Sequence, residues 1–210
     1  GDRWSSFDKK NTNKLLPSNT IRGIATHWKG ITWIATDEGL VSFDGRLWKT
    51  FTRKENGLPS DDVYDVAVAN DGTVWIATDN GVGKLVGRTC ANYVLDTKIR
   101  SVTLDLLGNC WAATKEDGVV EIENGKEKPY TAKDGLLSDE TFSVRCDPYG
   151  DIWVGSKLGL NKFTDRANAP KLASALFQKA DEFGAAGDWI AARQFYNLFF
   201  TKDYLLNAKE

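Results

Sequence analysis

The chain has 210 residues, 41% of them hydrophobic and 11% aromatic, which suits one domain with a sizeable core, alone or with an appendage. The net charge is -2, from 27 Lys and Arg against 29 Asp and Glu, without a long run of either sign. We therefore expect no nucleic-acid partner, because phosphate binding needs a basic patch, and no membrane span in this chain, because no stretch approaches the roughly 18 consecutive apolar residues that a span requires.

Metal and cofactor chemistry is not indicated. Cys90, Cys110 and Cys146 form no Cys-x-x-Cys motif and no cluster with the single histidine, His27. A structural zinc site needs four such ligands, so the sequence predicts no metal site and no cofactor. Whether two of the cysteines pair is left open. Cys110 precedes Trp111 in an apolar segment and is predicted to be a small core residue.

The chain opens with RWSSF at residues 3–7, which matches LWKTF at residues 47–51. Both segments have the composition of an outer strand. The connection FDKKNTNKLLPSNTI (7–21) follows the first of them, and FTRKENGLPSDDV (51–63) follows the second.

The central part of the chain repeats one phrase around Trp33, Trp75, Trp111 and Trp153, with spacings of 42, 36 and 42 residues. Repeats of about 40–50 residues form the blades of β-propellers. A residue required once in every unit is predicted to lie in the core, so we expect all four tryptophans to be structural.

The second unit shows how one repeat divides into strands. Its predicted strands are separated by the turn signals NDG and DNG, and they span residues 63–69, 73–78, 82–87 and 90–94. The third unit has a shorter connection, YVLDTKIRSV (93–102), which accounts for the spacing of 36 residues. The fourth unit returns to the long form with YTAKDGLLSDET (130–141) and ends at LGLNKF (158–163), without a fourth strand.

The full pattern, WxxFxxxNGLPSxxVxxxxxxxDGxxWIxTxxGL, resembles the two-component regulator propeller repeat of periplasmic sensor regions in bacterial hybrid two-component systems. The resemblance covers about residues 3–165. It implies a periplasmic or secreted bacterial protein, and a sensor-type propeller that binds a ligand or partner and has no catalytic activity of its own. Sensor regions that share the repeat usually close with more than four blades, so the blade count of this chain departs from the family.

The fold class predicted from these observations is an all-β propeller over residues 1–165, followed by a C-terminal α-helical hairpin. The propeller would have four short four-stranded blades, and the N-terminal strand would complete the last blade and remove its exposed edge. The alternative is a head-to-tail homodimer in which two chains share one eight-bladed ring.

The C-terminal part, residues 166–210, has apolar residues at helical spacing. Gly184 and Gly187 supply a break between two helices, and Asp188 is a suitable N-cap. Ala180 and Phe183 fall where a tetratricopeptide-like (TPR-like) hairpin places packing residues. Such a hairpin cannot bury both faces alone, so we expect a cap on the propeller, a peptide groove or a subunit interface.

Ligand contacts in a propeller usually come from loops at the mouth of its channel. The candidate ligand-binding residues in those loops are Asn19, Asp37, Asp61, Asp62, Asp79, Asp96, Asp139 and Glu140. They predict a mostly acidic mouth for a polar small molecule, a saccharide or a peptide. The competing interpretation is that Ser, Asn and Asp simply form good turns. Candidate partner-binding residues are the aromatic side chains of Trp28, Trp189, Phe195 and Phe199.

Catalysis is not predicted. His27 has no serine or cysteine nucleophile assigned to it and is expected to be an exposed loop residue. The first alternative function is a protein-assembly module that uses the propeller and the hairpin as interfaces. The second alternative function is a carbohydrate-active enzyme with paired carboxylates such as Asp61 and Asp139. DGTVW faintly resembles the Asp-box of sialidases, but the Ser-x-Asp start is missing and no arginine cluster is evident.

Overall fold

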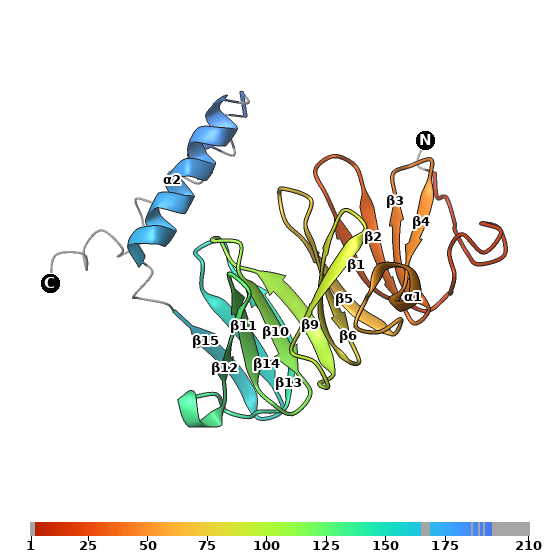
Figure 1. Ribbon diagram of the computed structural model, residues 1–210. Coiled ribbons are helices and arrows are strands. Elements are labelled where there is room, and N and C mark those ends of the chain that lie inside the picture. Colours follow the sequence, from red (N-terminus) through yellow and green to blue (C-terminus); the bar gives the residue numbers. More distant parts are fainter. Residues whose placement is uncertain (1–2, 165–168, 186, 189, 191, 195–210) are drawn as a thin grey trace, which may run out of the picture.

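The computed structural model describes residues 3–164, 169–185, 187–188, 190 and 192–194. Four antiparallel sheets follow one another along the chain and form an arc, with helix α2 standing apart from them (Figure 1). Each sheet is one repeat unit, and we call the sheets blades 1 to 4.

Blade 1 contains β1 (Ile21–Thr26), β2 (Thr32–Thr36), β3 (Gly39–Phe43) and β4 (Trp48–Phe51). Blade 2 contains β5 (Val63–Val68), β6 (Val74–Thr78), β7 (Gly81–Val86) and β8 (Thr89–Tyr93). Blade 3 contains β9 (Ile99–Leu104), β10 (Cys110–Thr114), β11 (Val119–Glu123) and β12 (Lys126–Tyr130). Blade 4 contains β13 (Thr141–Cys146), β14 (Ile152–Ser156) and β15 (Gly159–Phe163).

Two short helices and one longer helix accompany the blades. Helix α1 (Arg53–Asn56) and the 3-10 helix η1 (Ala132–Asp134) lie in the long connections before blades 2 and 4, and α2 spans Ala169–Ala185. Thr52 and Thr131 cap α1 and η1 through their side chains, and Gly57 and Gly135 end them in the left-handed conformation. The repeated connection is therefore a helical turn with a threonine cap and a glycine stop.

Strand pairing is consecutive in every blade, so each blade is a meander. The strands predicted for the second unit are confirmed to within one residue, because each apolar segment is bounded by a turn that contains glycine. Gly81 shows why glycine is needed there: its φ is +115° and an added Cβ would lie 2.7 Å from the carbonyl oxygen of Tyr93.

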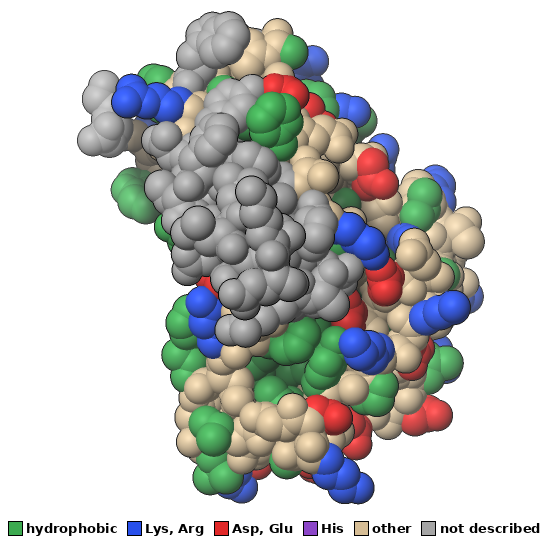
Figure 2. Space-filling view, turned by 90° about the vertical axis from the view of Figure 1, so that its left-hand side faces the viewer, with side chains coloured by type: hydrophobic (Ala, Val, Ile, Leu, Met, Phe, Trp, Pro, Cys, Tyr) green, Lys and Arg blue, Asp and Glu red, His purple; other side chains and the backbone are tan. Residues whose placement is uncertain are grey.

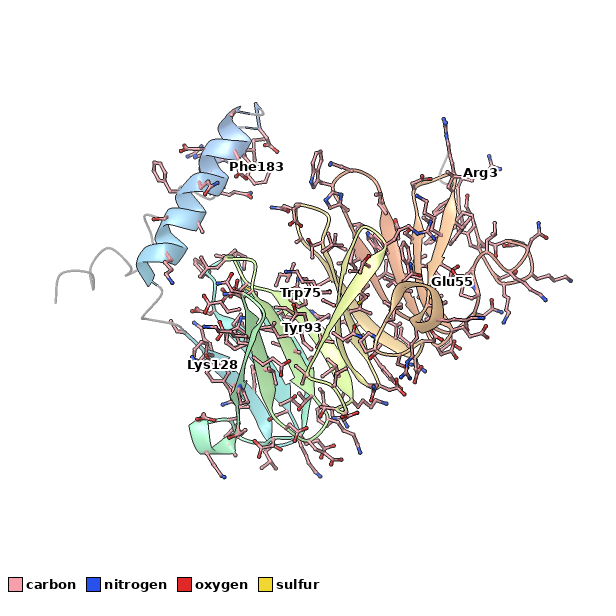
Figure 3. All side chains as sticks on the ribbon, in the orientation of Figure 1. Arg3, Glu55, Trp75, Tyr93, Lys128 and Phe183 are labelled. Atoms are coloured by element: carbon pink, nitrogen blue, oxygen red, sulfur yellow. The ribbon has the colours of Figure 1, made fainter. Side chains whose placement is uncertain are left out.

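Neighbouring blades pack face to face and form three hydrophobic cores. In each of them the tryptophan-bearing face of one blade, which we call its forward face, meets the opposite, rear face of the next blade. Trp75 and Tyr93 of blade 2 lie toward one another with ring centroids 5.8 Å apart (Figure 3). Middle blades are therefore covered on both sides, which explains why TVWIAT does not alternate between polar and apolar residues.

Trp33, Trp75 and Trp111 are buried, at 8%, 3% and 3% exposure, and the prediction that they form the core is confirmed. Trp153 is only half-buried, because no further blade among the described residues packs against its face of blade 4. Cys110 is buried in the core between blades 2 and 3, as predicted.

The predicted closure of the ring was wrong. Residues 3–7 form no strand and blade 4 has three strands, so the N-terminal segment does not complete it. Instead, the ring of Phe7 packs against Phe43 and Trp48 of blade 1, at 5.4 Å from each. Residues 8–20 join the segment directly to blade 1, and its apolar side chain packs on this adjacent blade rather than on blade 4 across the arc.

The first helix of the expected C-terminal hairpin is present as α2. Residues 190 and 192–194 are also helical, and the Ala192 N–H donates to the Asp188 carbonyl oxygen at 3.0 Å. The rest of the second predicted helix lies outside the described residues, so the hairpin and its TPR-like character stay predictions. Among the described residues, no helix has both the length and the hydropathy that crossing a membrane requires.

Candidate functional site

The innermost strands β1, β5, β9 and β13 lie side by side and line the inner side of the arc. Their second residues occupy one register position, eleven residues before the tryptophan of each blade. These residues are Arg22, Tyr64, Arg100 and Phe142. A cationic and an aromatic side chain therefore alternate from blade to blade at the end where the long connections enter the inner strands.

Each arginine lies on the aromatic ring of the next blade. The guanidinium carbon of Arg22 is 4.2 Å from the ring centroid of Tyr64, and that of Arg100 is 4.6 Å from the ring of Phe142. Lys98, which precedes β9, donates from Nζ to the Tyr64 hydroxyl at 2.7 Å. These contacts are cation–π and hydrogen-bonding interactions that hold flexible side chains in one geometry.

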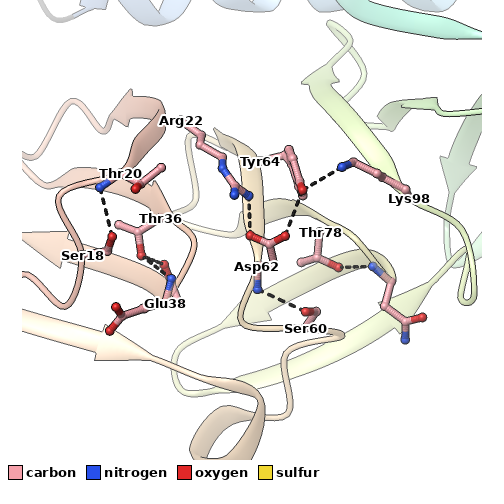
Figure 4. A network of polar contacts seen from close by, with 12 residues as sticks. Ser18, Thr20, Arg22, Thr36, Glu38, Ser60, Asp62, Tyr64, Thr78 and Lys98 are labelled. Carbon is pink, nitrogen blue, oxygen red and sulfur yellow. Dashed lines mark hydrogen bonds and ion pairs between the residues drawn. The ribbon is translucent and has the colours of Figure 1, made fainter.

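Two carboxylates pair with these cations. Asp62 forms an ion pair with Arg22 and accepts a hydrogen bond from the Tyr64 hydroxyl at 2.9 Å (Figure 4). Glu140 contacts Arg100 at 3.5 Å and Lys157 at 3.0 Å. The hydrogen bond from Lys157, followed by its charge and by Arg100, lowers the pKa of Glu140.

Asp37 belongs to the same region. A hydrogen bond from Ser18 is the main cause that lowers the pKa of its carboxyl group, with Thr20 and Arg22 as smaller contributors. The arrangement is thus a row of charged side chains beside the partly buried Tyr64 and the exposed Phe142, which we call the mouth cluster. It comprises Arg22, Asp37, Asp62, Tyr64, Lys98, Arg100, Glu140, Phe142 and Lys157.

A second polar network lies one to three residues further along the inner strands. Asp65 Oδ2 accepts hydrogen bonds from Ser101 Oγ at 2.9 Å and from the Val102 N–H at 3.1 Å. Arg145 reaches this carboxylate at 3.4 Å across blade 3 and donates to Ser101 Oγ at 2.8 Å. The network joins blades 2, 3 and 4 at the inner side of the arc.

The residues predicted for ligand binding separate into three groups. Asp37, Asp62 and Glu140 are brought together in the mouth cluster. Asn19, Asp61 and Asp139 instead accept hydrogen bonds from the backbone N–H groups of Lys9, Arg53 and Ala132, at 2.7, 2.6 and 2.6 Å. They stabilise the long connections, as the turn interpretation proposed. Asp79 and Asp96 lie in exposed turns, and Asp96 has a positive φ of 62°.

The expectation of a mostly acidic mouth is corrected by the structure, because arginine and lysine side chains balance the carboxylates there. Sequence reasoning missed Arg22, Tyr64, Lys98, Arg100 and Phe142, since it considered only the loops. The signal was available in the repeat register, where the position eleven residues before each tryptophan alternates between arginine and an aromatic residue.

His27 is buried, at 7% exposure, which contradicts the expected exposed loop. It stands six residues before Trp33, where blades 3 and 4 have Asp105 and Asp147 before Trp111 and Trp153. Its Nδ1 lies 3.4 Å from the Lys29 N–H, so it occupies the position of the turn-capping aspartates. Its Nε2 lies 3.2 Å from the Asn70 carbonyl oxygen of blade 2.

Of the predicted partner-binding aromatics, the structure describes Trp28, which is not part of the mouth cluster. Trp28 is 73% exposed, as expected, and its indole N–H donates to the Asn70 carbonyl oxygen at 3.2 Å. Trp189, Phe195 and Phe199 lie outside the described residues.

A cavity of about 730 Å³ opens at the opposite end of the inner strands. It is bordered by the first turns of blades 2, 3 and 4 and by Trp75 and Lys84. Its carboxylates are engaged in local structure: Asp105 and Asp147 accept the indole N–H groups of Trp111 and Trp153, at 3.2 and 3.0 Å.

Metal and thiol chemistry is not indicated in the described part of the chain. No group of three or more His, Cys, Asp or Glu side chains there is arranged to hold a metal ion. All three cysteines are free thiols, and burial raises the pKa of Cys90 to about 11 and that of Cys110 well above its ordinary value.

Comparison with known proteins identifies the repeat. The family model described as two component regulator propeller matches residues 57–80, which contain β5 and β6 of blade 2. No curated protein matches the chain.

Similar solved structures include the extracellular domain of a putative hybrid two component system from B. thetaiotaomicron, with 24% identity and a TM-score of 0.66 over 79% of this chain and 24% of that chain. PorZ, a surface component of the type-IX secretion system of Porphyromonas gingivalis, has 16% identity and a TM-score of 0.56 over 72% and 27% of the two chains. Virginiamycin B lyase from Staphylococcus aureus has 16% identity and a TM-score of 0.55 over 69% and 55%.

The chain spans about a quarter of the length of the first two of these proteins. At such identities the likeness concerns the fold, which unrelated functions share. The chain carries the two-component regulator propeller repeat on blades of a β-propeller fold.

Proposed function

We propose that this chain is a sensor-type propeller segment, located outside the cytoplasm, that binds a polar ligand at the mouth cluster and has no catalytic activity of its own. The observation that carries the proposal is the alternation of Arg22, Tyr64, Arg100 and Phe142 at one register position of four successive blades. A fold needs small or apolar residues between blades, but it does not need planar cations and aromatic rings along the inner side of the arc.

The chemistry of the cluster favours a saccharide as the ligand. Asp62 and Glu140 already balance Arg22 and Arg100, so the site offers hydrogen-bonding groups in fixed positions without a large excess charge. Phe142 is 46% exposed and offers an apolar surface beside these groups. Sites for small molecules combine such apolar surfaces with a few fixed polar groups.

The location and the sensor-type role are supported by the family of the repeat and by the extracellular hybrid two-component domain with the same fold. This support is an analogy at the level of the fold. The lyase with a similar fold shows that a catalytic site is compatible with such blades. In this chain, however, Asp61 and Asp139, the carboxylates first considered for glycoside hydrolysis, each stabilise their own connection.

Calorimetric titration tests the proposal with three probes: a set of neutral oligosaccharides, a set of uronate-containing oligosaccharides, and short basic peptides. We expect a neutral oligosaccharide to bind and Phe142→Ala to weaken its binding at least tenfold. Tyr149→Ala, which removes another exposed aromatic ring at the opposite end of the inner strands, is the matched control and should leave the affinity unchanged. Equal weakening by both substitutions, or no binding of any probe, contradicts the proposal.

A protein-assembly module is the second candidate function. It is favoured by a specific observation, the exposed apolar surface of blade 4, where Leu158 and Leu160 are 69% and 62% exposed. Exposed apolar surface of this kind marks sites of protein association.

A further inference from the structure

Blade 4 exposes a face that is buried in every other blade. Leu160 follows the glycine that starts β15, and its counterparts after the same glycine are Leu40, Val82 and Val119. These three residues are 0%, 0% and 1% exposed, whereas Leu160 is 62% exposed. In Figure 2, which views the side on which β15 lies, hydrophobic side chains are grouped below the residues drawn in grey. The forward face of blade 4 thus has the sequence of an interface and no blade against it.

Blade 1 exposes the complementary apolar surface on its rear face. Ile24 stands nine residues before Trp33, at the position held by Val66, Val102 and Val144 in the other blades. Those valines are 5%, 2% and 0% exposed, because each packs against the preceding blade, but Ile24 is 62% exposed. The two ends of the arc therefore expose the two halves of the interface that is formed three times within it.

The N-terminal segment lies on that rear face in the manner of an outer strand from a preceding blade. Phe7 corresponds to Phe51, which ends β4 of blade 1 and belongs to the core shared with blade 2. Phe7 likewise contacts Phe43 and Trp48 on blade 1, but it belongs to no sheet and is 52% exposed. Trp4 is 95% exposed. In the part of the chain that the structure describes, blade 4 has no outer strand, and the edge of β15 is a template for one.

We propose that a second copy of this chain docks head-to-tail, with the rear face of its blade 1 on the forward face of blade 4, and that its residues 3–7 add the missing fourth strand beside β15. The occupant is a second copy because the two free faces match each other in the register of the three internal interfaces, and a heterologous contact of this kind joins different patches of identical chains. Two arcs of four blades make eight, which is within the range of closed propellers. The proposal does not depend on the identity of the ligand at the mouth cluster.

Solution mass, measured by light scattering after size exclusion, is the primary experiment. We expect twice the 23.3 kDa of one chain. Leu160→Asp and Ile24→Lys should each reduce the mass to that of one chain, because each introduces a charge into one half of the interface. Both side chains are mostly exposed within one chain, so the thermal unfolding midpoint should stay close to that of the parent. Val86→Asp changes a residue that is 59% exposed on the outer side of blade 2 and is the matched control, with the mass unchanged.

An experiment that mixes the two variants distinguishes the loss of one interface from the loss of the folded structure. The Ile24→Lys copy keeps an intact blade 4 face and the Leu160→Asp copy keeps an intact blade 1 face, so an equimolar mixture should recover the doubled mass through one intact interface. A single-chain mass for the parent at all concentrations overturns the second copy as occupant. A doubled mass that both substitutions leave unchanged overturns the proposed surfaces and indicates association through another part of the chain. A mass above two chains overturns the closed pair.

Discussion

The interfaces between blades and the outer face of blade 4 have nearly the same sequence and very different burial. Leu40 and Leu160 both follow a glycine at the start of a third strand, yet one is fully buried and the other is 62% exposed. Trp75 and Trp153 show the same contrast, since only the former is covered by a following blade. The repeat therefore specifies a blade with two apolar faces, whereas the burial of those faces depends on a neighbouring blade that the repeat itself does not supply.

The same comparison separates local from non-local stabilisation. Hydrogen bonds within a blade, such as Thr78 Oγ1 to the Gly81 carbonyl oxygen at 2.8 Å and Ser156 Oγ to that of Gly159 at 3.0 Å, are alike in covered and uncovered blades. Apolar burial is not alike, and it is the dominant favourable contribution to folding. Blade 4 should therefore have the right shape but contribute less to the free energy of unfolding.

The largest expected effect is the contrast between Trp75→Ala and Trp153→Ala. Emptying the site of a buried tryptophan costs about 3–5 kcal/mol of the free energy of unfolding, and we expect this for Trp75. Trp153→Ala leaves no closed cavity, so it should lower the free energy of unfolding by less than half as much as Trp75→Ala. Urea unfolding of the two variants and the parent measures both values. Equal costs would show that blade 4 is covered in solution, and a cost below about 1 kcal/mol for Trp75 would contradict its place in the core.

A smaller contrast is expected from Asp105→Ala and Asp147→Ala. Both aspartates accept two turn N–H groups and the indole N–H of their blade's tryptophan, at 3.2 Å for Trp111 and 3.0 Å for Trp153. Trp111 is buried at 3% exposure, so water would reach its N–H less readily once the Asp105 carboxylate is removed, at a cost of about 1–3 kcal/mol. Water can replace Asp147 at the half-buried Trp153, so that substitution should cost less. Urea unfolding of both variants tests this order, and the reverse order would contradict it.

The division into blades could be predicted from the sequence because each strand is bounded by a glycine turn and each unit repeats its tryptophan. The turn role of Asp61 and Asp139 was also open to prediction, since Asp is favoured in turns. Chain closure could not be predicted in this way. RWSSF has the pattern of an outer strand, but a pattern does not determine which sheet it joins, and Phe7 contacts blade 1.

The mouth cluster was only partly predictable. Asp62 and Glu140 were found because they stand in the connections, whereas Arg22 and Arg100 were overlooked within strands. Their side chains meet Tyr64 and Phe142 only because successive inner strands lie side by side, and that is a property of the assembled arc. His27 was assigned to an exposed loop because its register with Asp105 and Asp147 was not compared.

A smaller effect is expected at Glu140 of the mouth cluster, where ion pairs with Arg100 and Lys157 rather than a covering blade provide the stabilisation. Lys157 and Arg100 lower the pKa of Glu140 below its ordinary value of 4.5, so the folded state favours the ionised carboxylate. The resulting stabilisation is complete above about pH 4.5 and is lost as the pH falls through the lowered pKa. The unfolded chain, in which Glu140 has its ordinary pKa, binds a proton more readily than the folded chain, so falling pH favours unfolding. Urea midpoints of the parent and Glu140→Gln, measured between neutral and acidic pH, should therefore converge once the pH is below the lowered pKa of Glu140.

Glu116→Gln, which removes an exposed carboxylate paired with Lys115, is the control. A parent and a Glu140→Gln variant with parallel pH profiles would show that the pairs with Arg100 and Lys157 do not persist in solution, and the mouth cluster would then lack the fixed geometry on which ligand binding is proposed to rest.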